Sequence, residues 1–565
     1  MGRSSNNSKK NTRKTTHNTK LKVSSTPLQI LVAVIPFLTG IFYEWQSALL
    51  AAVLIVLFFI EAFKNKMIEI RYGWPLFFAL SVVVFNILTT FWAVDKGMVW
   101  LGVLKYLPLL LFVIYAAGKE DILKFIPLSG VVMTVVSALL SPIEALKGHI
   151  TVSGRLGGFF EYPNTFAMFL LICLILVLFN EKLKIKDWIF CAVYLAGIAL
   201  SGSRTVLVLT FITAIVYVIR VKEKKIKLIA LGCIVVFTAL GAVYLVNKLS
   251  SLTNMSTFYG RLLYSYDALP VILKHPFGLG YYGYYYSQGS FQTGVYSVVH
   301  AHNDFIQLLL DIGWIPAVIA VITVFHGFRK ASFKNRVLLL MMVLHLLFDF
   351  DMQFISLAII LLAVVVESSE NRRKVFTTKN ISAMFVLSPV LLVFSLYFGL
   401  ASFFCFIKKY ESAAKIYPSY TEAQKVLLLN AQSTEDMEKI ADRMLKNNPN
   451  LALANDAKAR CVFSRGDITG MIEYKDRAVS YNKYELSEYV DYIEMLSYSI
   501  SLYSQAGDDQ SMMYCMNRCI SIESDLRAVE AGTSELGRKI DDQPQLTLPE
   551  EYSDYIFMLR NAKAG

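Results

Sequence analysis

Long apolar segments alternate with short polar ones through the first 400 or so residues. A helix that crosses the hydrocarbon core of a bilayer needs about 20 predominantly apolar residues. The pattern therefore predicts thirteen transmembrane helices followed by a more polar region. The predicted spans are about 28–43, 47–63, 73–92, 97–117, 122–140, 164–180, 187–202, 205–219, 228–246, 304–326, 337–348, 353–366 and 381–406.

The composition supports an all-α, polytopic membrane protein. Hydrophobic residues make up 55% of the 565 residues and charged residues only 17%, and the mean hydropathy is +0.49. These values lie outside the range of soluble domains. The net charge of +12 is expected from basic cytoplasmic loops, so it does not indicate nucleic-acid binding.

The distribution of Lys and Arg predicts the orientation. With the N-terminus inside, the inner loops carry 21 of these residues, whereas the outer loops up to residue 380 carry seven. Cytoplasmic loops are enriched in Lys and Arg. We therefore expect residues 1–24 to be a disordered, basic cytoplasmic tail without a cleavable signal peptide. Residues 25–407 form the predicted membrane domain, with an outward loop at 141–162 and a large one at 247–303.

Residues 408–565 differ from the rest: they are charged, contain no spanning segment and have helical periodicity. Gly466-Asp467 and Arg477-Ala478-Val479-Ser480 recur 41 residues later as Gly507-Asp508 and Arg518-Cys519-Ile520-Ser521. Such an echo predicts stacked helical hairpins of tetratricopeptide-like type, with an irregular helical bundle as the alternative. An odd number of spans would place this domain outside the cytoplasm.

Three arginines fall on the predicted outer side, where positive charge is not required by topology. They are Arg155, Arg204 and Arg261. A guanidinium group donates two parallel hydrogen bonds and stays charged, which suits phosphate or diphosphate. Contact with lipid headgroups is the alternative for each arginine alone. Together they favour an anionic ligand.

Other polar residues are candidates for chemistry. His302 lies where the large loop meets a span, and an imidazole can take a proton from an attacking hydroxyl; the pair with His300 could also be a metal half-site or an ordinary loop feature. Lys105 lies inside an apolar span, so it faces a cavity or reaches the interface. Asp349-Phe350-Asp351 resembles the carboxylate pair that binds a metal diphosphate in some glycosyltransferases, but it falls in a short outer turn, so it is interpreted as an exposed turn.

A tyrosine-rich run lies within the large outer loop. Such side chains suit either stacking on sugar rings or the membrane interface, and the sequence does not choose between these roles. The run consists of Tyr281, Tyr282, Tyr284, Tyr285 and Tyr286.

The order of these motifs resembles the family of O-antigen ligases and polymerases, over about residues 30–400. The matching pieces are Arg155 through Asn164-Thr165-Phe166-Ala167; Ser201-Gly202-Ser203-Arg204; Gly260-Arg261 with Pro276, Gly278 and Gly280; and His302-Asn303-Asp304-Phe305 with Leu309, Asp311, Ile312 and Gly313. Pro316, Asp311 and Tyr264 depart from the family pattern.

The resemblance implies a metal-independent, inverting membrane glycosyltransferase without cofactors. It would move a glycan from undecaprenyl diphosphate to an acceptor hydroxyl at the outer face of the bacterial cytoplasmic membrane. Arg204 and Arg261 would bind the diphosphate, and His302 would act on the acceptor. The expected supporting or substrate-binding residues are Arg155, Asn164, Asn303, Lys105 and Tyr285.

Two other classes remain open, namely a transporter or flippase of lipid-linked glycan and a non-catalytic membrane scaffold. The expected partners are the lipid-linked donor, a glycan, lipid or protein acceptor, the bilayer and assembly proteins bound by the repeat domain. The sequence does not distinguish ligase from polymerase, and it identifies neither the sugar and acceptor nor the envelope type and oligomeric state.

Overall fold

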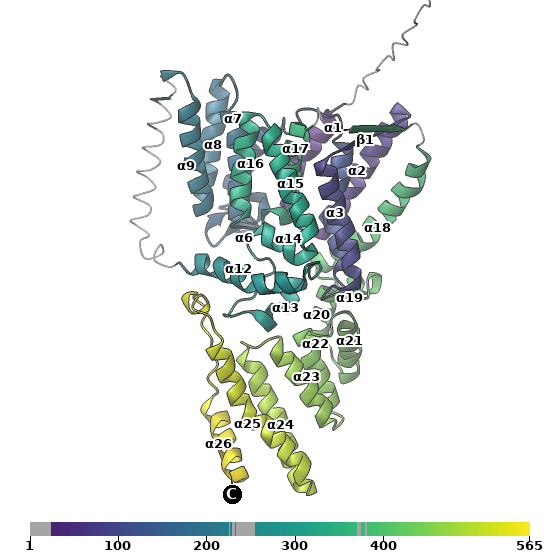
Figure 1. The fold of residues 1–565 in the computed structure, drawn as a ribbon, viewed down its shortest axis with the longest axis vertical. Coiled ribbons are helices and arrows are strands. Elements are labelled where there is room, and N and C mark those ends of the chain that lie inside the picture. Colours follow the sequence, from purple (N-terminus) through teal and green to yellow (C-terminus); the bar gives the residue numbers. More distant parts are fainter. Residues whose placement is uncertain are drawn as a thin grey trace, which may run out of the picture.

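The computed structural model describes residues 24–224, 227–228, 232, 255–369, 374–378 and 381–564. These residues are mostly helical and form a bundle of apolar helices, with a second group of helices at one end of it (Figure 1). The all-α class expected from the sequence is confirmed.

The helices of the bundle overlap twelve of the predicted spans. The span predicted at 28–43 is wrong as a single helix, because α1 ends at Val34 and the 3-10 turns η1 (Ile35–Phe37) and η2 (Thr39–Ile41) follow it. The span predicted at 228–246 falls almost entirely outside the described residues. The bundle helices are α1 (Thr26–Val34), α2 (Glu44–Asn65), α3 (Trp74–Leu88), α4 (Val99–Tyr115), α5 (Ile126–Leu140), α7 (Pro163–Leu178), α8 (Ile185–Ser201), α9 (Arg204–Arg220), α14 (Asp304–Ile312), α15 (Trp314–Lys330), α16 (Phe333–Leu346), α17 (Ile355–Ser369) and α18 (Ser382–Phe406).

Within the described residues, three helices are both long and apolar enough to cross a membrane by themselves. They are α2, α3 with its 3-10 extension η3 (Thr89–Phe91), and α18. Shorter apolar helices include α4, α5, α7 and α17. The helices agree with a membrane protein, and the number of spans stays a prediction.

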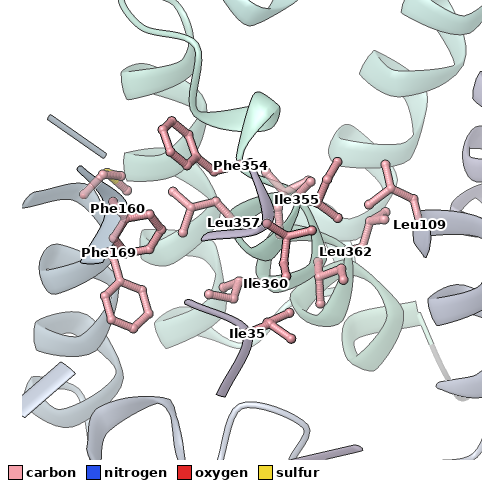
Figure 2. Packing of buried hydrophobic residues seen from close by; sticks show 14 of the residues in the cluster. Ile35, Leu109, Phe160, Phe169, Phe354, Ile355, Leu357, Ile360 and Leu362 are labelled. Atoms are coloured by element: carbon pink, nitrogen blue, oxygen red, sulfur yellow. The ribbon is translucent and has the colours of Figure 1, made fainter. Parts of the chain in front are cut away.

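The centre of the bundle is formed by α7 and α17. Both are apolar on all sides, and a helix of that kind has to be buried; the side chains from Thr165 to Leu178 and from Ile355 to Val366 are indeed buried. Figure 2 shows part of this core. Phe160, in the 3-10 turn η4 (Gly158–Phe160), packs against Phe169 and Phe354 at ring distances of 5.4 and 5.7 Å.

The outer surface of the bundle is apolar along α18. This helix packs against α2 and α4, but its other side leaves Phe385, Val390, Val393 and Leu396 more than half exposed. A contiguous apolar surface of this kind is expected where a helix faces lipid. The exposed face of α18 therefore supports the membrane location.

The span predicted at 304–326 is wrong as a single helix, because α14 ends at Ile312 and α15 begins at Trp314. Gly313 between them has φ +81°, and a Cβ there would lie 2.3 Å from the carbonyl oxygen of Pro276. The backbone N–H groups of Leu279 and Gly280 donate to the last carbonyls of α14, those of Leu310 and Asp311. The chain around 276–280 thus caps α14 and ends it.

The two ends of the bundle carry different small elements (Figure 1). At one end, β1 (Ile68–Tyr72) pairs with β4 (Lys374–Thr378) in an antiparallel ladder. The other end carries α6 (Glu144–Ile150), the pair β2 (Thr151–Val152) and β3 (Arg155–Leu156), and η4, followed by α12 (Ser256–Lys274) and α13 (Gly283–Phe291). The two loops predicted to face outward therefore share one end and contain helices.

The C-terminal region is a series of helices packed in antiparallel pairs. The predicted echo falls on equivalent turns of two pairs, since Gly466 and Gly507 both have positive φ, and Asp467 and Asp508 both cap the following helix. The tetratricopeptide-like class itself stays a prediction. The helices are α19 (Tyr410–Ile416), α20 (Thr421–Leu429), α21 (Thr434–Asn447), α22 (Ala452–Phe463), α23 (Ile468–Ser480), α24 (Leu486–Ala506), α25 (Asp509–Ala531) and α26 (Glu550–Ala564).

This region docks on the same end of the bundle that carries α12 and α13. The buried carboxylate of Asp95, between α3 and α4, accepts hydrogen bonds from Thr421 Oγ1 at 2.8 and 3.0 Å. A clamp segment, residues 533–542, packs against α12 and the loop after α13. In the clamp, Ser534 bonds to Thr293, and the backbone N–H of Asp541 donates to Ser256 at 2.7 Å.

We predict that the docking at Asp95 makes the protein less stable as pH rises. Burial raises the pKa of Asp95 to about 6, although Thr421 and the N–H of Gly97 oppose this. Because the pKa is higher in the folded state, stability is greatest below the unfolded value of 3.8 and falls as pH rises through about 6. Asp95→Asn should therefore stabilise the protein at pH 8 by up to about 3 kcal/mol, and by less at pH 5.

Thermal unfolding of the detergent-solubilised protein at both pH values measures this difference. Asp509→Asn, at the exposed first turn of α25, is the matched control; it removes a favourable charge at a helix start and should lower stability by a similar small amount at both pH values. An equal loss of stability at both pH values in Asp95→Asn would contradict the prediction, because it would mean that the carboxylate hydrogen bonds outweigh the cost of burial.

Candidate active site

A buried carboxylate, Asp349, lies at the centre of the polar end of the bundle. It follows α16 in the turn that leads to α17, and its side chain is 1% exposed. Tyr162 Oη donates to Asp349 Oδ1 at 2.8 Å, and Asn164 Nδ2 donates to Oδ2 at 2.7 Å. The N–H of Phe350 donates to Oδ1 as well. A buried charge is tolerated only when it is paired and hydrogen-bonded, and Asp349 meets both conditions.

Two of the predicted catalytic residues reach the same carboxylate. Arg261 Nη2 lies 3.3 Å from Asp349 Oδ2, and His302 Nδ1 lies 3.5 Å from Oδ1. Burial alone would raise the pKa of Asp349, but His302, Arg261 and His345 outweigh burial and lower it. Asp349 is therefore ionised at neutral pH. The side chains of Arg261 and His302 are about one-fifth exposed, so both can also meet a ligand.

Arg155 joins this group through Asn164. Its Nη2 donates to Asn164 Oδ1 at 2.7 Å, and its Nε donates to the carbonyl of Ser201 at 2.7 Å. Burial and the nearby charges of Arg204 and Arg261 lower the pKa of Arg155, while Asp349 opposes them. A guanidinium remains protonated at neutral pH even so. The three arginines thus act on one region of space.

The remaining hydrogen-bond donors of this cluster are open to a ligand. Arg204 is exposed at the first position of α9, and the part of the chain that the structure describes holds no ion pair or hydrogen bond of its side chain. Arg261 Nε is buried and has no partner. Helix N-termini and guanidinium groups both favour anions. Among the described residues Arg261 is the arginine of this cluster that pairs with Asp349, so Arg204 leaves positive charge that no carboxylate neutralises.

The loop that carries His302 is held in an unusual conformation. His302 has φ +51°, a region that non-glycine residues adopt at a cost. The next residue, Asn303, accepts hydrogen bonds from the N–H groups of Phe305 and Ile306 and thereby caps α14. The ring of His302 also packs edge-on against Phe350 at 4.8 Å. The cap and this ring contact hold the imidazole beside Asp349.

Three other predicted binding residues have partners inside the protein. Lys105 is buried in α4 and donates to the carbonyl of Phe42. Asn303 caps α14. Tyr285 contacts Lys425 of the C-terminal region, whose ammonium group lies 4.9 Å from the ring centre. A role of these three in substrate binding stays a prediction, whereas each has a role in the fold.

The tyrosine-rich run also belongs to the core. Tyr281, Tyr284 and Tyr286 are buried, and Tyr281 donates to the buried carboxylate of Glu44 at 2.6 Å. Tyr286 donates to Glu422 of the C-terminal region. Two roles were open for this run, sugar stacking and the membrane interface. Instead, Tyr281 packs inside the bundle, and Tyr286 joins the bundle to the C-terminal region.

The interpretation of Asp349-Phe350-Asp351 as an exposed turn is wrong, because both carboxylates are 1% exposed. The turn folds inward between α16 and α17, where Asp351 accepts a hydrogen bond from Thr165 at 2.6 Å and pairs with His345. Tyr162 is the other site residue that the sequence did not reveal. One feature of the sequence could have indicated that these carboxylates are buried. Asp349 and Asp351 lie in a short turn between two strongly apolar segments, on the predicted side of the membrane that also carries the three arginines.

The described residues contain no group of three or more His, Cys, Asp and Glu that could hold a metal ion. His300 and His302 do not point to such a site together. His300 is buried against the ring of Phe350 at 5.1 Å, and burial, with the charges of Lys105 and His302, lowers its pKa to about 3. His300 is therefore a neutral packing residue.

Comparison with known proteins identifies one segment. Residues 189–321 match the family model described as O-Antigen ligase. This segment includes Arg204, Arg261 and His302, whereas Arg155, Asn164 and Asp349 lie outside it. No curated protein and no solved structure matches the chain.

The family match supports ligation or polymerisation of lipid-linked glycans in general, by a glycosyl-transferring enzyme of the bacterial inner membrane. It also agrees with the order of motifs described above, of which Arg261, His302, Asn164 and, through Asn164, Arg155 meet at Asp349. Residues 189–321 of this chain are thus similar to the O-antigen ligase family.

Proposed function

We propose that the protein transfers glycan from undecaprenyl diphosphate to an acceptor hydroxyl at the end of the bundle that carries Asp349, on the outer side of the membrane. The observation that carries this proposal is the meeting of Arg261, His302 and, through Asn164, Arg155 at one buried carboxylate. These residues come from four separate segments, and packing alone does not require them to meet.

The arginines supply what the leaving group needs. As the bond between the anomeric carbon and the diphosphate oxygen breaks, the diphosphate keeps the electron pair and gains negative charge. Arg204 and Arg261 Nε have no partners in the described residues and are available to stabilise that charge. Preorganised donors directed at developing charge are the largest contribution in many enzymes. Guanidinium groups thus take the role that a metal ion has in other transferases.

His302 supplies the base. With Nδ1 facing the Asp349 carboxylate, its proton sits on Nδ1 and the lone pair of Nε2 is free. The acceptor oxygen bonds to the anomeric carbon, and its proton moves to Nε2. Asp349 remains an anion and stabilises the imidazolium, as the aspartate of a catalytic triad does. Attack opposite the leaving diphosphate inverts the anomeric centre.

We predict that His302→Ala abolishes transfer, because the acceptor loses its base. General bases typically contribute about 10²–10⁴-fold. The measurement is glycan transfer or chain lengthening by purified protein in proteoliposomes that contain an undecaprenyl-diphosphate oligosaccharide, with and without EDTA. EDTA should have no effect. His149→Ala is the matched control, since His149 is an exposed histidine of an outward loop.

The same assay distinguishes a glycosyltransferase from a flippase and from a non-catalytic scaffold. A flippase would move the labelled lipid between leaflets without joining glycans, and a scaffold would do neither. Transfer that persists in both His302→Ala and Arg204→Ala would contradict the proposed site, whereas Arg527→Ala, an exposed arginine of the C-terminal region, should transfer normally.

A second prediction concerns Asp349. Asp349→Asn keeps the size of the side chain but removes the charge that orients His302 and pairs with Arg261. We expect a loss of about 10²-fold or more in kcat. Tyr162→Phe removes one hydrogen bond to the same group and should cost no more than about tenfold. Equal losses in the two variants, at unchanged thermal stability, would show that the charge of Asp349 does not matter.

A further inference from the structure

A cavity lies beside the candidate active site, on the side away from the arginines. It has a volume of about 600 Å³ and runs between α3 and α4 on one wall and α14 to α17 on the other. None of the residues lining it comes from α7, α8, α9 or α12, the elements that surround Arg155, Arg204 and Arg261. We refer to this cavity as the lateral groove.

The lateral groove is apolar along most of its length and opens toward the lipid. Its lining includes Val321 and Phe325 of α15 and Leu340 of α16, all exposed at the surface of the bundle. In a membrane, such side chains face the hydrocarbon core. A groove with an apolar lining and a lipid-facing mouth suits a hydrocarbon chain.

One end of the lateral groove is polar. Asp304 and Asn86 both line it, and among the described residues no group forms a hydrogen bond with the buried Asp304 Oδ1 and Asn86 Oδ1. Unsatisfied buried polar atoms are rare in folded proteins. Asp304 is 7% exposed, and its other oxygen accepts the N–H of Met352 in the turn that contains Asp349. The polar end thus adjoins the turn that holds the base in place.

The chemistry of this end selects a neutral hydroxyl group rather than a phosphate. A hydroxyl donates and accepts, so it can bond to a carboxyl group in either protonation state and to an amide oxygen. A diphosphate needs cations, and no lysine or arginine lines the lateral groove in the part of the chain that the structure describes. The two carboxyl groups there, of Asp304 and Asp311, offer a diphosphate no stabilisation.

We propose that the lateral groove binds the apolar chain of a neutral, hydroxyl-bearing glycolipid of the glycosyl-diacylglycerol kind, which serves as the acceptor. This inference rests on the proposed function and adds its acceptor. One hydroxyl of the sugar headgroup lies at Asp304 and Asn86, beside the turn of Asp349, and a neighbouring hydroxyl of the same sugar is the acceptor. Its oxygen bonds to the anomeric carbon of the donor, the bond from that carbon to diphosphate breaks, the diphosphate leaves with the electron pair, and the hydroxyl proton moves to His302.

The test is photo-crosslinking of the purified full-length protein in phosphatidylcholine nanodiscs with a diazirine-bearing glycosyl diacylglycerol. We expect crosslinked peptides from α15 and α16, and competition by unlabelled glycolipid but not by phosphatidylglycerol. Ala320→Trp fills the lateral groove from α15 and should reduce labelling about tenfold, a loss of about 1.4 kcal/mol in binding, because the indole occupies the space of the lipid chain. Val343→Trp, from α16, is an independent filling variant.

Val318→Trp is the matched control, because Val318 is exposed on α15 and does not line the lateral groove. Labelling that both filling variants leave unchanged would overturn the proposal and indicate bulk lipid. Loss of undecaprenyl-diphosphate binding in these variants, with glycolipid labelling intact, would also overturn it, by assigning the groove to the donor. Labelling does not require catalysis, so the outcome is independent of transfer and of His302→Ala.

Discussion

The burial of one carboxylate is the constraint on which the polar end of this protein depends. Removing an anion from water costs several kcal/mol unless donors surround it. Asp349 accepts hydrogen bonds from Tyr162, Asn164 and Arg261, and His302 Nδ1 lies 3.5 Å from it. These groups come from three separate parts of the chain, so satisfying this charge brings the start of α7, α12 and the loop before α14 into one place. The same contacts arrange the groups that the proposed reaction needs.

The apolar core fixes where this charge can lie. Phe354, five residues after Asp349, packs against Phe160 of η4, and Thr165 at the start of α7 holds Asp351. The turn between α16 and α17 is therefore attached to the two buried helices at the centre of the bundle. From the other side, the clamp at residues 533–542 packs on α12, the helix that bears Arg261. The C-terminal region thus contributes to the position of a site residue that it does not touch directly.

The sequence predicted the parts of this structure that depend on local pattern. The length of the apolar segments predicted the helices. The unequal distribution of Lys and Arg predicted which loops face the same side, and these loops do lie at one end of the bundle. It could not predict which polar residues would be buried, because that depends on contacts between distant segments: Asp349 looks like an ordinary turn residue until Asn164 and Arg261 are placed beside it. The break at Gly313 escaped detection for the same reason. The carbonyls of Leu310 and Asp311 at the end of α14 accept hydrogen bonds from Leu279 and Gly280, each 31 residues earlier in the chain, and hydropathy does not record this contact.

Two different chemical environments lie on either side of Asp349, namely the arginine cluster and the lateral groove. On one side, the guanidinium groups of α9, α12 and β3 provide positive charge, and none of the residues lining the lateral groove comes from these elements. On the other, the lateral groove provides apolar surface and hydroxyl partners without a cation. A transferase that joins a diphosphate-linked sugar to a neutral hydroxyl needs these two properties, and it needs them apart, because each substrate would be held poorly in the environment of the other. His302 and Phe350 lie at the boundary between the two, where the imidazole faces Asp349 and the phenyl ring covers it. The specificity of such an enzyme would follow from this division of charge rather than from the shape of either site alone.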